Sequence, residues 1–307
     1  MSRTIAPIEE RASYGIGILL LGQLFFVLLD PSAKWLVVQG MPVAEVVFVR
    51  YFVHVVLLLA IFLPTQGRAM LITANWRIEA LRGLALLGLT GLNFLALRFL
   101  PLTVTGALTF TMPLIVCALS VPMLGERVGW RRWLAIAVGF CGILIITRPG
   151  SEAFHPAALL SLLAAGCAAL HSIFTRKLAG VDSAATQQFY AGAIALACIT
   201  PFAFDGWVWP ADGAAWFAFV AVGASGLVGH LLVSVAHRYS TPSTLGPFNY
   251  LQLLYMAAVS WLLFNQPPDV WFFLGAPVII LSGLYIWLRE RRLARVPVPV
   301  TIEDVKG

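Results

Sequence analysis

Charged side chains occur inside strongly apolar stretches near the start of the chain, where they are costly unless they are paired or functional. Asp30 and Lys34 are four residues apart in one stretch, and Arg50 stands in the next. If both stretches are helices, Asp30 and Lys34 share one face. A carboxylate and two cations at membrane depth could form ion pairs, open and close a passage, or hold a zwitterionic small molecule.

The turn around Gly40 makes these two stretches antiparallel neighbours. Asp30 and Arg50 lie at similar depth from the turn, roughly 12 Å at about 1.5 Å per residue. We therefore expect the ion pairs Asp30–Arg50 and, nearer the turn, Lys34–Glu45. Two interpretations stay open: the pairs lock the hairpin, or they form a gate that contacts a zwitterionic substrate.

Further polar residues predict a cavity in the middle of the molecule. Asn93 and His230 lie near the centres of two glycine-rich apolar stretches. His171 lies in a third stretch and could carry a coupling proton, because histidine titrates near neutral pH. Alternatively, His171 could only hydrogen-bond a neighbouring helix.

Prolines in two other stretches leave backbone carbonyls free to bind polar groups of a substrate. Thr109 and Phe110 precede Pro113, and Asn249 and Tyr250 follow Pro247. Aromatic rings at such positions suit apolar or aromatic substrates as well as organic cations. The residues that we expect to bind substrate are Asn93, Phe94, Thr109, Phe110, His171, His230, Asn249 and Tyr250.

The composition indicates which solvent surrounds these residues. The 307 residues are 60% hydrophobic and 11% charged, against about 45–50% and about 25% in soluble domains. This composition excludes an ordinary soluble enzyme, a disordered protein and a disulfide scaffold. No nucleotide-binding, nucleophile or metal-ligand motif occurs, so we expect no cofactor, no metal and no enzymatic activity. The net charge of +6 is scattered along the chain, so we expect no nucleic-acid partner.

Stretches of about 20 apolar residues predict helices that span a membrane. Ten such stretches occur, at 14–38, 43–63, 79–97, 101–122, 131–147, 156–176, 184–203, 213–235, 243–264 and 269–288. With a cytoplasmic N-terminus, sixteen of the twenty Lys and Arg residues, Arg82 among them, fall on the cytoplasmic side, as the positive-inside rule requires. We expect an all-α membrane protein with both termini in the cytoplasm.

The two halves of the chain are similar to each other. A shift of 140 residues places Gly83 on Gly223, Arg98 on Arg238 and Phe110 on Tyr250. Each half then holds five spans, and an odd number inverts the second half across the membrane. Inverted repeats are typical of secondary transporters, which hold substrate near the midplane. We expect one repeat over residues 1–150, a second over 151–290 and a cytoplasmic tail over 291–307.

The residues from 112 to 150 carry a proline in a span, a Gly125-Glu126-Arg127 turn and a glycine-bearing span after it. This stretch resembles the end of an EamA repeat, from the drug/metabolite transporter superfamily, and residues 28–36 and 46–52 are similar to the same family. The second repeat departs from the pattern, with Asn265-Gln266 in place of Gly-Glu. The resemblance implies a ten-helix carrier of the bacterial inner membrane that works by alternating access.

Among the branches of this family, the chain looks most like bacterial exporters of amino acids and related metabolites. We expect export of amino acids, with neutral and aromatic ones favoured, by a monomer that could couple transport to a proton. Efflux of cationic drugs, or transport of a nucleotide-linked or organic-acid metabolite, is the alternative within transport. A membrane enzyme or a sensor is the alternative outside it, and no soluble domain or catalytic constellation favours either.

Overall fold

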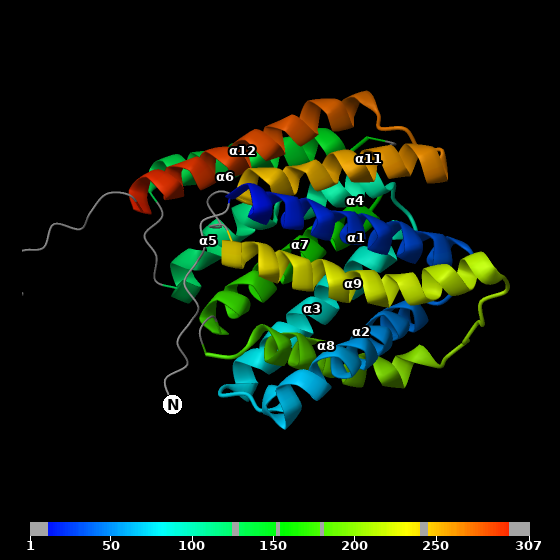
Figure 1. Ribbon diagram of the computed structural model, residues 1–307. Helices are drawn as coiled ribbons and strands as arrows, with labels where there is room; N and C mark the ends of the chain where they lie inside the picture. The colour runs from blue at the N-terminus through cyan, green and yellow to red at the C-terminus, as the bar shows by residue number, and fades with distance from the viewer. Residues whose placement is uncertain (1–11, 125–128, 152–153, 179–180, 240–244, 295–307) are drawn as a thin grey trace, which may run out of the picture.

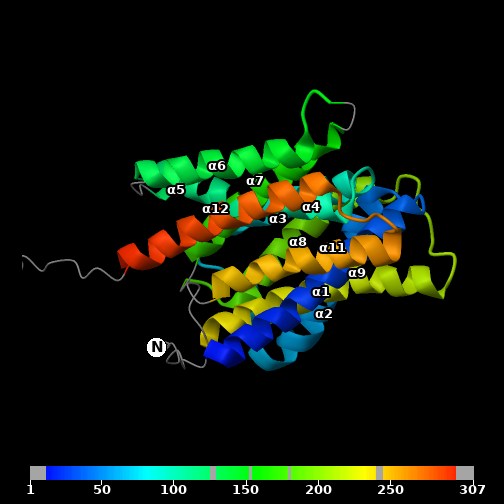
Figure 2. The ribbon, with the colours of Figure 1, turned by 90° about the horizontal axis from the view of Figure 1, so that it is seen from above.

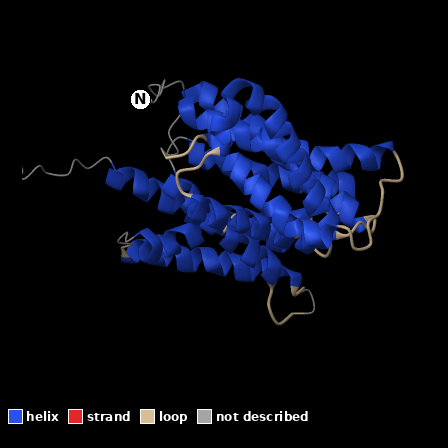
Figure 3. Cartoon of the chain, turned by 90° about the horizontal axis from the view of Figure 1, so that it is seen from below, coloured by secondary structure: helices blue, strands red, loops and turns tan. Residues whose placement is uncertain are grey.

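The computed structural model describes residues 12–124, 129–151, 154–178, 181–239 and 245–294. Over these residues the chain is built from helices, without a strand (Figure 3). The first half contains α1 (Ala12–Val38), α2 (Val43–Gln66), η1 (Gly67–Leu71), α3 (Trp76–Leu97), α4 (Leu102–Thr109), α5 (Met112–Leu124) and α6 (Trp130–Thr147). The second half contains α7 (Ala157–Leu178), α8 (Ala184–Ala203), α9 (Gly213–Tyr239), η2 (Gly246–Tyr250), α11 (Leu251–Phe264) and α12 (Val270–Ala294).

Several helices begin at a side chain that accepts a hydrogen bond from the first turn. Asn75 accepts from the backbone N–H of Ile78 at the start of α3, with a donor–acceptor distance of 3.3 Å. Ser183 does the same for α8, and Asp212 and Asp269 for α9 and α12. Such caps satisfy backbone donors that the helix itself leaves unpaired. They explain why these helices begin close to the predicted residues.

Within the described residues, eight helical segments are long and apolar enough to cross a membrane. They confirm that the chain is an all-helical, multi-pass membrane protein. Two of the ten predicted spans are not among the eight. The predicted span 184–203 is the helix α8, which carries buried Thr186, Gln187 and Gln188. The predicted span 243–264 contains an apolar helix of fewer residues, Phe248–Phe264.

The connections between helices gather at two opposite ends of the bundle. At one end, which we call the Gly40 end, residues 39–42 lie beside residues 204–208. The backbone N–H of Val208 donates to Glu45 at 2.9 Å, and Arg148 pairs with Asp269 at 3.0 Å. At the other end, the Arg68 end, Thr73 donates to Asp182 at 2.6 Å.

Helices of the first half pack mainly against helices of the second. The largest interfaces are α1 with α9, α3 with α7, α6 with α12 and α2 with α8, and the first and third of these pairs lie side by side in Figures 1 and 2. Both figures also place the start of α1 and the end of α12 toward the same end of the bundle. A chain that crosses the bundle an even number of times begins and ends at the same end.

Candidate functional site

A charged cluster lies between α1, α2 and α3. The side-chain amide of Asn93 donates to Asp30 at 3.2 Å, and the half-buried Asp30 lies within the electrostatic reach of Arg50. Arg50 is 7% exposed and donates to the hydroxyl oxygens of Tyr51, at 2.8 Å, and Thr90. Glycine at position 226 of α9 keeps the space beside the guanidinium free of a side chain. These contacts bring together one carboxylate, one guanidinium and one amide near the middle of the bundle.

The structure corrects both predicted ion pairs. Lys34 does not pair with Glu45: its ammonium group donates to the carbonyl oxygen of Leu100 at 2.7 Å and to the side chain of Gln266 at 2.8 Å. Glu45 instead accepts from a backbone N–H of the α8–α9 connection. These connections come from distant parts of the chain, so a comparison of depth on two neighbouring helices could not reveal them.

The Asp30–Arg50 pair is close but not direct. Asn93 provides the hydrogen bond to Asp30, while Tyr51 and Thr90 hold the guanidinium of Arg50. The two charges therefore act on each other through space, and each keeps its own hydrogen-bond partners. Asp30 is half-buried, whereas Arg50 is 7% exposed.

Phe94 is placed differently from the prediction. Its side chain is 1% exposed and belongs to the hydrophobic core around α1, α2 and α3. The guanidinium carbon of Arg50 lies 5.9 Å from the centre of its ring, a separation typical of a cation–π contact. Phe94 therefore supports Arg50 from within the core and does not border open space.

An aromatic pair lies where two helices are interrupted. Phe110 stands at the break between α4 and α5, and Tyr250 ends η2. The centres of their rings are 5.5 Å apart, and the two residues are counterparts under the 140-residue shift. Thr109 donates to its own helix at the carbonyl oxygen of Thr105, at 2.8 Å. Its hydroxyl is therefore already occupied, and the two rings are the stronger candidates for ligand contact.

Asn249 lies beside this aromatic pair and is exposed. Its side-chain oxygen accepts a hydrogen bond at 3.2 Å from Gln23 of α1. Gln23 was not among the predicted site residues, although a polar side chain seven residues before Asp30 is a usable signal. Seven residues are two helical turns, so Gln23 and Asp30 share the face of α1 that points into the bundle.

The two histidines occupy different surroundings. The ring of His230 on α9 packs edge-on against Phe26 of α1, with ring centres 4.9 Å apart. His171 on α7 approaches the carbonyl oxygen of Arg82 at 3.2 Å. The contact of His171 joins α7 to α3, as the simpler of the two predicted roles requires. Its proposed part in proton coupling stays a prediction.

Arg82 is buried and has partners that the charge pattern did not predict. The sequence placed it on the cytoplasmic side, at the start of the predicted span 79–97, and the structure shows that it is 2% exposed and lies inside α3. Its guanidinium donates to Thr175 at 2.8 Å and to the carbonyl oxygen of Gln187 at 2.5 Å, and lies 3.6 Å from Glu79. Arg82 therefore ties α3 to α7 and α8 near the Arg68 end. The predicted Gly125-Glu126-Arg127 turn falls outside the described residues.

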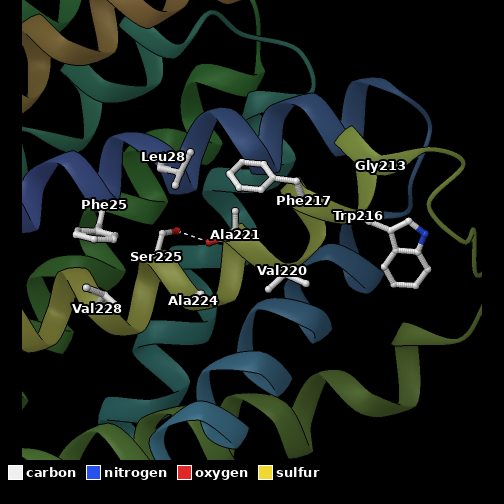
Figure 4. Close-up of a pocket in the computed structure, with 10 residues that line it drawn as sticks. All are labelled: Phe25, Leu28, Gly213, Trp216, Phe217, Val220, Ala221, Ala224, Ser225 and Val228. Carbon is white, nitrogen blue, oxygen red and sulfur yellow. Dashed lines mark hydrogen bonds between the residues drawn. The ribbon is translucent and has the colours of Figure 1, made fainter.

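A depression of about 500 Å³ lies between α1 and α9 (Figure 4). Apolar side chains line most of it, and Phe217, Val220 and Trp216 are strongly exposed there. None of the predicted site residues borders this depression. Its walls belong to α1 and α9, and it is separate from the polar cluster.

The family assignment follows from comparison with known proteins. The sequence profile of the EamA-like transporter family matches residues 13–148 and again residues 155–288. The chain therefore belongs to the EamA-like transporter family. It is a multi-pass transporter of a bacterial inner membrane, not an enzyme.

Individual relatives carry different cargoes. The S-adenosylmethionine uptake transporter of Rickettsia bellii is 30% identical, over 91% of this chain and 95% of the relative. The riboflavin transporter of Vibrio cholerae is 31% identical, over 90% and 94%. The pseudopaline exporter of Pseudomonas aeruginosa is 26% identical, over 79% and 85%. A crystal structure that is 20% identical aligns with a TM-score of 0.61 over 92% of this chain and 99% of that chain, and so shares its fold.

Proposed function

We propose that this transporter carries a small metabolite in which a planar ring is joined to a zwitterionic or cationic group. The observation that carries the proposal is a pair of subsites along one face of α1. The charged subsite contains Asp30, Asn93 and Arg50, and the ring subsite contains Phe110 and Tyr250. Gln23 adjoins the ring subsite and lies two turns of α1 from Asp30, about 10 Å along the helix axis.

The charged subsite has the chemistry for an α-amino acid group. The half-buried Asp30 can accept a hydrogen bond from an ammonium group or neutralise the charge of a sulfonium, and Asn93 adds an amide beside it. The positive charge of Arg50 can attract the carboxylate of the cargo. Ionisable groups at membrane depth typically mark substrate pathways, and this cluster lies at the interface of three helices.

The ring subsite has the chemistry for a planar heterocycle. Phe110 and Tyr250 offer two aromatic rings 5.5 Å apart, and both side chains are half-buried. Asn249 is exposed next to them and can hydrogen-bond the edge of a ring. Aromatic faces stack on planar groups and attract cations.

The relatives support a cargo of this kind more than a simple amino acid. S-adenosylmethionine, the cargo named for one relative, contains an amino acid group, a sulfonium and an adenine ring. Riboflavin, named for another, contains a planar ring system. In place of the export of amino acids expected from the sequence, we therefore propose transport of a larger molecule that contains a zwitterionic group. The relatives are named for uptake and for export alike, so their names favour neither direction.

Packing between the halves supports the expected ten crossings and inverted repeats. When the two halves are exchanged, the α1–α9 interface corresponds to α7–α3, and α2–α9 corresponds to α8–α3. All four interfaces are extensive. The interfaces α2–α8 and α6–α12 each correspond to themselves. A bundle whose contacts are preserved by this exchange is suited to alternating access, in which one half rocks against the other.

The proposal is tested by counterflow in proteoliposomes. Vesicles loaded with unlabelled S-adenosylmethionine, riboflavin or an amino acid mixture are diluted into each labelled compound, with and without a proton or sodium gradient. We expect saturable exchange of S-adenosylmethionine, which has both a ring and a zwitterionic group, with exchange of simple amino acids at least about tenfold slower. Exchange of simple amino acids alone, of riboflavin alone, which has no cationic or zwitterionic group, or of none of these compounds would contradict the proposed cargo.

Asp30→Asn tests the charged subsite directly. Asparagine keeps an oxygen that accepts from Asn93 but removes the negative charge. We expect a folded protein with at least about tenfold slower exchange of S-adenosylmethionine. Asp212→Asn is the matched control, because Asp212 caps α9 at the Gly40 end. Equal exchange rates in both variants and the parent protein would show that Asp30 does not bind the cargo.

A further inference from the structure

The side chain of Gln23 is 1% exposed and lies between α1 and η2. Its amide nitrogen donates to the carbonyl oxygen of Phe248 at 3.0 Å and to the side-chain oxygen of Asn249 at 3.2 Å. The carbonyl of Phe248 can only accept, so the nitrogen of Gln23 must face it. The orientation of the Gln23 amide is thereby determined by the backbone of η2.

This orientation determines that of Asn249 as well. Because Gln23 presents a donor, Asn249 must present its oxygen to Gln23 and turn its amino group away. Asn249 is exposed, and the described residues provide no hydrogen bond to that amino group. We take these donors to be available to a ligand that binds beside Tyr250, the next residue along the chain.

Gln23 also lies on the face of α1 that points into the bundle. Phe26 on the same face contacts His230, and Asp30 contacts Asn93. The α1 backbone approaches α9 closely at the adjoining Gly22, where an added Cβ would lie 3.3 Å from the carbonyl oxygen of Gly229. Gln23 follows directly on this close contact, and its side chain is directed at η2.

We propose that Gln23 is a specificity-determining positioning residue, which holds Asn249 so that its amino group donates to an acceptor atom on the ring of the cargo. This inference rests on the proposed function and adds the chemistry that the ring must carry. A heterocycle with a ring nitrogen or carbonyl acceptor at its edge is bound, and a ring of the same shape without that acceptor is bound more weakly. Gln23 itself does not touch the cargo.

The first test uses ring analogues of S-adenosylmethionine in which N1, N3 or N7 is replaced by C–H, together with the parent compound. We expect at least one replacement to weaken binding to the parent protein about tenfold, the size of one lost hydrogen bond. In Gln23→Met that difference shrinks to less than about threefold, because Asn249 is free to rotate. Asn249→Asp keeps the oxygen that Gln23 binds and loses the amino group, so it loses the same preference.

The matched control is Gln188→Met, which removes a second buried amide, 6% exposed, from α8 and away from η2. We expect it to leave the preference among the ring analogues unchanged. If Gln23→Met keeps the preference of the parent protein, or if all three analogues bind to the parent protein as well as S-adenosylmethionine does, the inference is overturned. If the parent protein does not bind S-adenosylmethionine, the proposed cargo fails instead.

A second test needs no cargo. The melting temperature in detergent is measured for Gln23→Met, Asn249→Ala and the double variant. If Gln23 holds Asn249, the double variant melts at a temperature higher than the sum of the two single shifts predicts, because each single variant already breaks the shared bond. Strictly additive shifts would overturn the positioning role whatever the cargo is.

Discussion

Arg50 shows how a single buried cation is retained inside the bundle. Its guanidinium donates to the hydroxyls of Tyr51 and Thr90, and Tyr51 in turn donates to the carbonyl oxygen of Leu86 at 2.9 Å. The side chains of Tyr51 and Thr90 are 1% and 3% exposed. A buried charge without such partners would be strongly destabilising. The network therefore stabilises Arg50 at the depth where the charged subsite needs it.

Thr90→Val tests this network, because valine has nearly the shape of threonine but no hydroxyl. We expect the free energy of unfolding to fall by about 1–3 kcal/mol, since the variant removes a hydrogen bond from a charged group. Thermal unfolding in detergent measures the change. Thr65→Val is the matched control, because Thr65 is exposed and bonds only to carbonyls of its own helix. Similar melting temperatures for both variants would show that the network does not stabilise the fold.

Some contacts of the charged residues could be predicted from their spacing along the chain, and others could not. Asp30 and Arg50 are neighbours because both lie about eight residues from the same turn, which the sequence displays. The hydrogen bonds of Lys34 depend on Leu100 and Gln266, which follow α3 and α11. No periodicity on α1 indicates those partners, because they are brought to Lys34 only when the helices pack.

At the scale of helices, small residues determine how closely two elements approach. Gly142 of α6 faces Gly275 of α12, and a Cβ added to Gly142 would lie 2.9 Å from the carbonyl oxygen of Gly275. Backbone atoms cannot move aside as a side chain can. Close backbone contact at small residues is a common way in which membrane helices associate. The α6–α12 interface therefore depends on glycine at this position.

Gly142→Ala should separate α6 from α12. We expect a loss of about 1–3 kcal/mol in the free energy of unfolding, the usual cost of overpacking, measured by thermal unfolding in detergent. Gly91→Ala in α3 is the control, since an added Cβ there meets nothing within 4 Å. Alanine in an open helical position should be neutral or stabilising by up to about 1 kcal/mol. Equal losses in the two variants would contradict a role for close approach.

The helices themselves were largely predictable, and their interruptions were not. Most described helices begin and end within a few residues of the predicted apolar stretches, because an apolar run and its capping residues are local features. The break at Phe110 and the 3₁₀ turn at Gly246–Tyr250 divide predicted single spans. Pro113 and Pro247 indicated weakened helices there, but the residue at which the helix ends depends on the neighbours it meets.

For the whole molecule, the arrangement of loops at two ends predicts which residues reach each side of the membrane. Asp205 lies in the connection at the Gly40 end, and Arg68 lies in η1 at the other end. Both side chains are exposed. Because the sequence assigns most basic residues to the side of Arg68, we predict from the positive-inside rule that this end faces the cytoplasm.

Cysteine labelling in intact cells tests this orientation. In a cysteine-free background, Asp205→Cys should react with a membrane-impermeant maleimide added outside, once the outer membrane is made permeable. Arg68→Cys should react only after the inner membrane is opened. Reaction of both residues from the same side would contradict the ten crossings, and a reversed pattern would contradict the orientation.

The solvent of this protein, its helical class, its family and most of its helices follow from the sequence by itself. Those properties depend on local runs of apolar residues, on caps and on motifs that are contiguous along the chain. The tertiary structure decided which polar groups meet: Gln23 with Asn249, Asn93 with Asp30, Lys34 with Gln266, and Arg82 with α7 and α8. Such pairings join residues far apart in sequence, so they form only when the helices pack. Members that packing buries, such as Gln23 and Lys34, then need a polar partner because water no longer reaches them.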